Sequence, residues 1–230
     1  MKIAFLHTVR SNIALFQPYI DDLLPTSNIQ ISHFLEESLL DQAIESTPSQ
    51  AVNNSQNITC AQSIESVVHA YIKNIARQGF DLIVCTCSSI GEYAETTSGL
   101  SAKVVRIDRA MAEKAVRFRH LYILAAAEST VSPTYKLVCQ SAEKTPLSVC
   151  EMIHVTIVPH AWQHYSNGDH SAYITSISKA IESTLENAPS NSVIILAQAS
   201  MAPAATFSHP FIPILTSPID GIQSLLRYIK

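Results

Sequence analysis

Glycine is scarce in this sequence, with five in 230 residues. None of the five lies in a GxGxxG or GxxxxGK[ST] pattern, so the chain lacks the glycine-rich loops that bind dinucleotides and nucleoside triphosphates. Charged residues are also few, at 15%, and the formal net charge is −4. Proteins that bind nucleic acid normally carry a clustered excess of basic residues. The composition therefore argues against a nucleotide cofactor and against a nucleic-acid partner.

Long apolar runs and a disulfide framework are missing as well. The longest apolar runs, such as 121–127 and 193–197, are far shorter than the roughly 20 residues of a membrane-spanning helix. The short apolar run before His7 does not have the pattern of a secretory signal. The cysteines are Cys60, Cys85, Cys87, Cys139 and Cys150. Because their number is odd and low, we expect a cytoplasmic protein with at least one free thiol. Because the apolar runs are short, we expect no membrane partner.

Apolar residues, which make up 47% of the chain, fall into alternating strand-like and helix-like segments. The strand-like runs are 3–7, 29–34, 81–85, 104–107, 120–126, 151–158, 193–197 and 212–215. The segments with helical spacing include 61–78, closed by Gly79, and 132–143, 170–187 and 218–228. This alternation predicts an α/β protein with mostly parallel sheets flanked by helices. The alternation of strand-like and helix-like segments starts again near residue 120, which predicts two similar halves.

Small polar side chains follow the strand-like runs, where parallel α/β sheets bind their ligands. We expect the substrate-binding residues among Thr8, Ser88, Ser89, Ser129, Thr130, Ser200 and Thr216. Hydroxyls can donate hydrogen bonds to carboxylate oxygens, so these residues favour a small polar or anionic ligand. Serine and threonine also cap helices, and we expect about half of the set to contact the ligand. Cations near the strand ends are limited to Arg10 and Arg109.

Cys87 is the candidate catalytic residue. It follows the strand-like run 81–85 and precedes a predicted helix through Tyr93. A thiol near a helix N-terminus has a lowered pKa and can act as a nucleophile or as a general base. We therefore predict a thiolate at Cys87, although buried cysteines are also commonly inert. Cys85 is expected to point into the sheet.

The histidines do not predict a metal site. His160 and His164 have His-x-x-x-His spacing, but Ala161 stands where a metalloprotease has glutamate. No Cys-x-x-Cys pair is present either, so we expect no metal site. His7 ends the first strand, where it either lines the ligand site or is a buried histidine with hydrogen-bond partners.

Several segments, in this order along the chain, resemble the aspartate/glutamate/hydantoin racemase superfamily. They are 2–8 (KIAFLHT), 86–91 (TCSSIG), 106–112 (RIDRAMA), 129–130 with 133–134 (ST and PT), 196–202 (LAQASMA) and 213–218 (PILTSP). The resemblance implies two similar lobes with the active-site cleft between them. We expect residues 1–110 to form the first lobe, completed by a C-terminal helix at 217–230, and residues 111–216 to form the second.

The resemblance also implies a reaction without pyridoxal phosphate or metal. Racemases of the superfamily use one cysteine from each lobe as acid and base on opposite faces of the carbon α to a carboxylate. Cys87 matches the first of these cysteines, and Ser129 with Thr130 matches residues that contact the substrate carboxylate. Ala199 stands at the position of the second cysteine, and its methyl group cannot exchange a proton. A homodimer is the assembly that the resemblance implies.

The alanine at position 199, in place of the second cysteine, leaves several functions open. The first is an isomerase, a racemase or epimerase of a small amino acid or related acid, with Cys87 and a second group such as His7, His160 or water. The second is a single-cysteine decarboxylase of a malonate-type acid, and a maleate-type isomerase would also need only Cys87. The third is a carboxylate-binding protein without catalysis, because a fold does not by itself imply a function.

Overall fold

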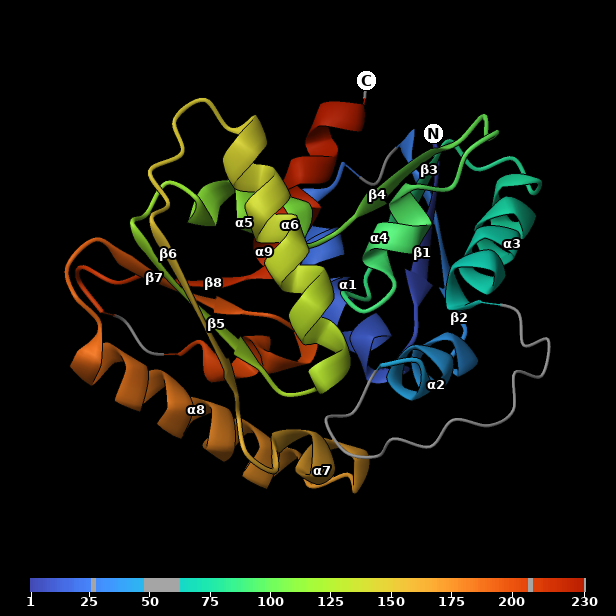
Figure 1. Cartoon of the computed structure of the whole chain (residues 1–230). Helices are drawn as coiled ribbons and strands as arrows, with labels where there is room; N and C mark the ends of the chain where they lie inside the picture. The colour runs from blue at the N-terminus through green and yellow to red at the C-terminus, as the bar shows by residue number, and fades with distance from the viewer. Residues whose placement is uncertain (26–27, 48–62, 207–208, 230) are drawn as a thin grey trace.

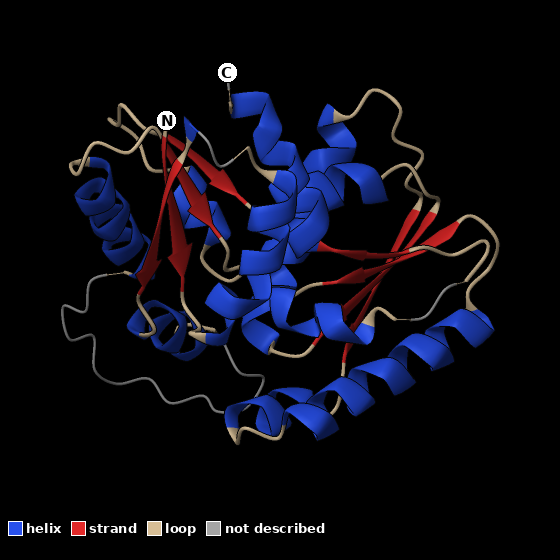
Figure 2. Ribbon diagram, turned by 180° about the vertical axis from the view of Figure 1, so that it is seen from behind, coloured by secondary structure: helices blue, strands red, loops and turns tan. Residues whose placement is uncertain are grey.

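The computed structural model describes residues 1–25, 28–47, 63–206 and 209–229. Within these residues the chain forms two four-stranded sheets, which lie on either side of a central group of helices (Figure 1, Figure 2). All neighbouring strands are parallel, which confirms the predicted α/β class with two similar lobes. The segment 46–57 is rich in serine, asparagine and glutamine, and this composition predicts a surface loop. It lies mostly outside the described residues, as does Cys60.

The first sheet has the strand order β2-β1-β3-β4. Its strands are β1 (Lys2–His7), β2 (Gln30–Leu35), β3 (Leu82–Cys85) and β4 (Lys103–Arg106). All residues of β3, and all but the first residue of β1, are buried. Helices cover both faces of such a sheet, and for this reason its central strands β1 and β3 appear in the sequence as mainly apolar runs.

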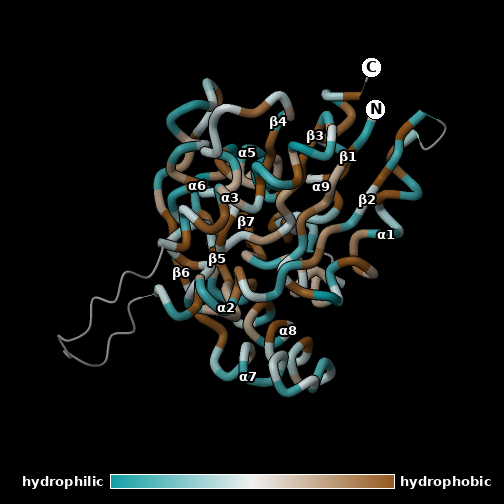
Figure 3. Tube along the Cα trace, turned by 90° about the vertical axis from the view of Figure 1, so that its right-hand side faces the viewer, coloured by the Kyte–Doolittle hydropathy of each residue, from teal (hydrophilic) through white to brown (hydrophobic). Residues whose placement is uncertain are grey.

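Four helices belong to this half of the chain: α1 (Ser11–Leu23), α2 (Ser38–Glu45), α3 (Ile64–Ala76) and α4 (Gly91–Glu95). Helix α1 buries Phe16 and Ile20 against one face of the sheet, whereas α3 buries Val68 and Ile72 against the other. The helices alternate between hydrophilic and hydrophobic colours along the trace (Figure 3), as amphipathic helices do. Helix α2, which buries Leu39, is not among the segments predicted from helical spacing.

The second sheet has the strand order β6-β5-β7-β8. Its strands are β5 (His120–Ala125), β6 (Met152–Ile157), β7 (Ser192–Leu196) and β8 (Ile214–Thr216). The helices of this half are α5 (Arg109–Ala115), α6 (Val131–Lys144), α7 (Ala161–Ser166) and α8 (His170–Asn187), with the 3-10 helices η2 (Glu128–Thr130) and η3 (Ala199–Ala204). Asp169 caps α8 by accepting a hydrogen bond from the backbone N–H of Ala172 at 3.0 Å.

After β8 the chain returns to the first sheet. Helix α9 (Ser217–Ser224) and the 3-10 helix η4 (Leu225–Tyr228) follow directly, and Ile222 and Leu225 pack in the apolar cluster that contains Phe5. Gly221 lies so close to Ile107, the residue after β4, that an added Cβ would overlap the carbonyl oxygen of Ile107. The described helices include none that is both long and apolar enough to cross a membrane.

Candidate active site

A pocket of about 410 Å³, its open mouth included, lies where carboxyl ends of strands from both sheets meet. Parallel strands end at one edge of a sheet, so the segments that follow β1, β3, β5 and β7 converge there. The pocket brings together predicted residues from both lobes, namely Thr8, Cys87, Ser88, Ser89, Ser129, Thr130, Ala199 and Ser200. Thr216, also predicted, does not line this pocket. It ends β8 and directly precedes α9.

Other lining residues were not predicted as part of the site. They are Val9, Asn12, Leu40, Thr86, Ala127, Trp162, Tyr165 and Gln198. Thr86 and Gln198 follow strands directly, which is a signal that the sequence offered. The Gln198 side chain has a structural role, because its Oε1 accepts hydrogen bonds from the backbone N–H groups of Ala126 at 2.6 Å and Ala127 at 3.3 Å.

Cys87 lies in the loop between β3 and α4 and is 9% exposed. Burial raises the pKa of its thiol, and this effect exceeds the opposing effects of the Thr8 hydroxyl, the backbone N–H groups of Ile90 and Ser89, and the Ser89 hydroxyl. The prediction of a lowered pKa is therefore wrong, and the thiol is the dominant form at neutral pH. Helix α4 begins only at Gly91 and has five residues, so its dipole does not offset the burial.

The neighbouring cysteine, Cys85, is fully buried in β3, as predicted. Its Sγ donates a hydrogen bond to the carbonyl oxygen of Cys87 at 3.5 Å, and burial raises the pKa of the Cys85 thiol. Cys85 does not line the pocket. Its contact with the backbone of Cys87 helps to fix the loop that carries the candidate catalytic thiol.

Several of the predicted hydroxyls already have partners in the protein. Ser88 donates to the carbonyl oxygen of Ala197 at 2.7 Å, and Thr130 donates to that of Ala127 at 2.7 Å. Ser200 Oγ lies 2.8 Å from the hydroxyl of Tyr173. The hydroxyl hydrogens of Ser88 and Thr130 are thus used in holding loops together. The oxygens of Ser88 and Thr130 can still accept hydrogen bonds, but the two hydroxyls cannot donate a hydrogen bond to a carboxylate.

Thr8 and Asn12 are two buried polar residues that line the pocket. Both residues are buried, at 2% and 7% exposure respectively, and both line the pocket. Within the described part of the chain, the Asn12 Oδ1 has no hydrogen-bond partner, and the Thr8 hydroxyl has none other than the Cys87 thiol. Buried polar atoms are normally paired, so unpaired ones that line a pocket mark positions where a ligand can bind.

Helix α7 supplies an aromatic wall. The rings of Trp162 and Tyr165 stack with their centroids 5.3 Å apart and an angle of 22° between their planes. The Tyr165 hydroxyl lies 2.6 Å from the Oγ of Ser11 and thereby joins α7 to the start of α1. This wall was not predicted, because residues 161–166 were not among the segments with helical spacing. Trp162 is the only tryptophan of the sequence, which was a signal that could have singled it out.

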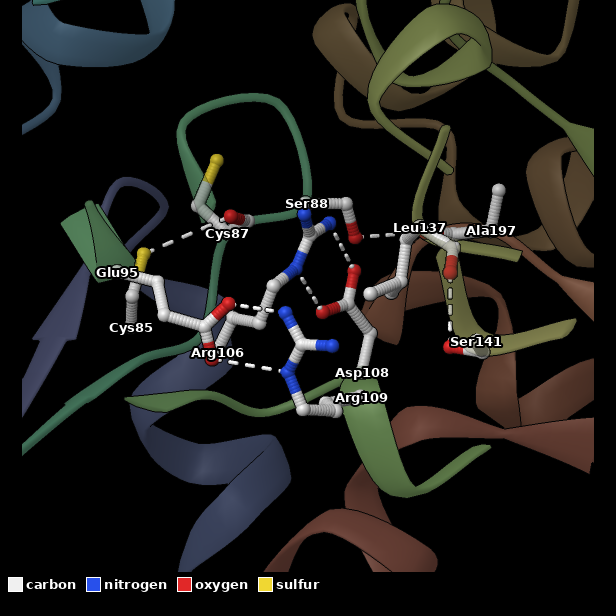
Figure 4. A network of polar contacts seen from close by, with 10 residues as sticks. All are labelled: Cys85, Cys87, Ser88, Glu95, Arg106, Asp108, Arg109, Leu137, Ser141 and Ala197. Atoms are coloured by element: carbon white, nitrogen blue, oxygen red, sulfur yellow. Dashed lines mark hydrogen bonds and ion pairs between the residues drawn. The ribbon is translucent and has the colours of Figure 1, made fainter. Parts of the chain in front are cut away.

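Two arginines near the Cys87 loop are held in ion pairs (Figure 4). The buried Arg106 donates from Nε to Asp108 Oδ1 at 2.7 Å and from Nη2 to Asp108 Oδ2 at 2.8 Å. Arg109 pairs in the same two-pronged way with Glu95. Neither arginine lines the pocket, and Arg10 is exposed outside it. The cations that the sequence placed near the strand ends are therefore not positioned to bind a carboxylate in this pocket.

The histidines lie outside the pocket. His7 is fully buried, with its Nδ1 3.0 Å from the Thr86 hydroxyl and its Nε2 2.9 Å from the Nδ1 of His33. Burial, with a smaller effect of His33, lowers the pKa of His7 to about 3. His160 is exposed and has a left-handed backbone, with φ of 58°. In the described ranges, no group of three or more His, Cys, Asp or Glu side chains could hold a metal ion.

Comparison with known proteins identifies the fold. No family model and no curated protein matches the sequence. Among solved structures, the aspartate racemase of Picrophilus torridus is similar, with a TM-score of 0.66 at 12% identity over 99% of this chain and 94% of that one. A glutamate racemase from Thermus thermophilus, in complex with β-chloro-D-alanine, gives a TM-score of 0.62 at 15% identity over 99% of this chain and 80% of that one.

An allantoin racemase from Klebsiella pneumoniae has the same fold, with a TM-score of 0.60 at 15% identity over 99% of this chain and 88% of that one. These likenesses cover nearly the whole chain. They confirm, at the level of the fold, the resemblance that the sequence segments predicted: two α/β lobes of the racemase type. At such low identity they do not establish a reaction or a substrate.

Proposed function

We propose that this protein is a cofactor-independent racemase- or epimerase-like enzyme that acts at the carbon α to a carboxylate of a small amino acid or related acid. The observation that carries the proposal is the position of Cys87. Its thiol lines a pocket between two lobes of the racemase fold, and the other lobe contributes Ala199 to the same pocket. Cys87 is thus the acid/base group on one side of the bound substrate.

In the proposed reaction, the Cys87 thiol first gives its proton to water. The thiolate sulfur then takes the α-proton and leaves the electron pair on an enolate-like intermediate. Donors in the pocket then stabilise the negative charge on the carboxylate oxygens. The hydroxyls available for this are Thr8 and one of the pair Ser89 and Ser129, whose oxygens lie 3.1 Å apart. A proton returned by Cys87 restores the original configuration, whereas inversion needs a second group or a water on the side of Ala199.

A second candidate is a decarboxylase of a malonate-type acid, and the raised pKa of Cys87 favours it. In that reaction the bond to the leaving carbon dioxide breaks and its electron pair stays on the α-carbon. The Cys87 thiol then donates its proton to that carbon, and water reprotonates the sulfur. This sequence starts from the neutral thiol that burial favours, and it needs no acid or base at Ala199.

The proposal also includes the arrangement of the chain. Residues 1–110 form the first lobe with 217–230, and residues 111–216 form the second, which the packing of Ile222 and Leu225 beside Phe5 supports. A homodimer is part of the proposal on the strength of the resemblance alone. A cytoplasmic location accords with free thiols at Cys85, Cys87, Cys139 and Cys150.

Exchange of the α-proton in D₂O tests the proposal. The loss of the α-proton NMR signal is followed over D- and L-amino acids and their N-acetyl derivatives, with wild-type protein and with Cys87→Ala. Cys139→Ala is the matched control, because Cys139 is half-buried in α6, outside the pocket. We expect exchange that falls by about 100-fold or more in Cys87→Ala, the scale of a general acid/base, and persists in the control.

The other outcomes separate the alternatives. Exchange without inversion means that Cys87 works on one face only. An absence of exchange, combined with Cys87-dependent release of carbon dioxide from substituted malonates, replaces the racemase with the decarboxylase. Binding without either reaction would leave a carboxylate-binding protein.

A further inference from the structure

The pocket holds no charged side chain while Cys87 is a neutral thiol. Its lining residues all belong to the described part of the chain, and none of them is Asp, Glu, Lys, Arg or His. A free amino acid would bring both an ammonium and a carboxylate into this space. Hydroxyls and backbone N–H groups can replace the hydration of the carboxylate, but the lining offers the ammonium no anionic partner. Removal of an ammonium from water without such a partner is strongly unfavourable.

Instead of an anionic partner, the lining includes a neutral hydrogen-bond acceptor. Asn12 lies in the first turn of α1, is 7% exposed and lines the pocket. Its Oδ1 is buried and has no donor within the described residues. An unpaired buried amide oxygen is costly. Rotation of the side-chain amide would turn this oxygen towards the pocket, where one N–H group of a ligand would satisfy it. A neutral amide N–H matches this oxygen without adding a charge to the pocket.

We infer that the substrate is a carboxylic acid whose α-nitrogen belongs to an amide, as in an N-acyl amino acid, and that Asn12 accepts the hydrogen bond from this N–H. The inference rests on the proposed function for the carboxylate end and deepens it by naming the nitrogen. The aromatic wall of Trp162 and Tyr165 offers an apolar surface to the acyl group. Asn12 is then the residue that selects amides over free amines.

Binding measurements test the inference separately from catalysis. Ligand-observed NMR titration compares both enantiomers of N-acetylalanine with those of alanine, on wild-type protein and on Asn12→Leu and Asn12→Asp. Asn74→Leu and Asn74→Asp are the controls, because Asn74 is exposed on α3 and does not line the pocket.

We expect wild-type protein to bind N-acetylalanine at least tenfold more tightly than alanine. Asn12→Leu should weaken that binding about tenfold, the factor that one hydrogen bond commonly contributes. Asn12→Asp supplies an anion and should shift the preference towards alanine and its ammonium. The Asn74 variants should bind as wild type does.

Failure of the inference is distinguishable from failure of the proposed function. Asn12-dependent binding of N-acetylalanine without α-proton exchange sustains the inference and contradicts the function. Cys87-dependent exchange on alanine, with tighter binding of alanine than of N-acetylalanine, sustains the function and overturns the inference. Unchanged affinity in Asn12→Leu, or no binding of either compound, also overturns the inference.

Discussion

The hydroxyls of Ser89 and Ser129 meet across the two lobes, with their oxygens 3.1 Å apart. Ser89 belongs to the loop after β3, and Ser129 belongs to η2 after β5. Both residues line the Cys87 pocket, and both also line a second cavity to which Glu92 and Lys136 contribute. The pair therefore lies at the boundary between an uncharged pocket and a charged cavity.

This hydrogen bond should couple the stabilities of the two lobes. Ser89→Ala and Ser129→Ala each leave one buried hydroxyl unpaired, so each should lower the free energy of unfolding by about 1 kcal/mol or more. The double variant should lose less than the sum, with a coupling energy of ~1 kcal/mol. Urea unfolding of the four proteins measures the cycle. Strictly additive losses would show that the two hydroxyls do not interact.

Substitution of Ala199 tests whether a thiol is the only group that the second lobe lacks for racemisation. Ala199 is buried and lines the pocket, so Ala199→Cys places a titratable group on the wall that now holds a methyl. We expect exchange on one face to become racemisation, detected as the appearance of the opposite enantiomer on a chiral column. Ala199→Ser is the control, because its hydroxyl is a poor acid or base at neutral pH. Equal racemisation in both variants would contradict a role for the thiol.

Acid should destabilise the protein through His7. The pKa of His7 is lowered from 6.5 to about 3 in the folded protein, first by burial and then by His33. The unfolded chain therefore binds the proton at a higher pH than the folded protein does. The stabilising contribution is complete above pH 6.5 and is lost as the pH falls towards 3.

This linkage makes the free energy of unfolding depend measurably on pH. Between pH 7.5 and pH 5, His7 alone should cost ~2 kcal/mol of the free energy of unfolding, as the urea midpoint would report. His7→Gln should flatten the pH dependence by a similar amount. His33, whose pKa burial also lowers, should retain its own smaller effect. A wild-type curve that is level over this range would refute the assignment.

The pair of Arg106 and Asp108 should be intolerant of single substitutions. Burial by itself would raise the pKa of Asp108, but the charge and hydrogen bonds of Arg106 hold it below its ordinary value. Arg106→Met or Asp108→Leu leaves an uncompensated buried charge and should cost about 3–5 kcal/mol. The double variant should be more stable than either single one in thermal and urea unfolding. If it were the least stable of the three, packing rather than charge would control the site.

The class of fold and the chemistry of the candidate residues could be predicted from the amino-acid sequence. Parallel strands that are buried on both faces must be apolar throughout, so runs such as 82–85 and 193–196 were recognisable without tertiary information. Ligands bind beyond the carboxyl ends of such strands, and this rule pointed to Thr8, Cys87 and Ser129. The alanine at position 199 is likewise a fact of the sequence alone.

The pKa values, hydrogen-bond partners and pocket contacts of these residues depend on tertiary packing. The pKa of Cys87 depends on desolvation by atoms from distant segments, so the local helix that predicted a thiolate did not control it. Thr216 follows a strand as Cys87 does, yet it packs at the start of α9 away from the pocket. Asn12 became a candidate because its buried oxygen has no partner in the described chain. Burial and hydrogen-bond pairing arise from residues far apart in sequence, and local patterns do not encode them.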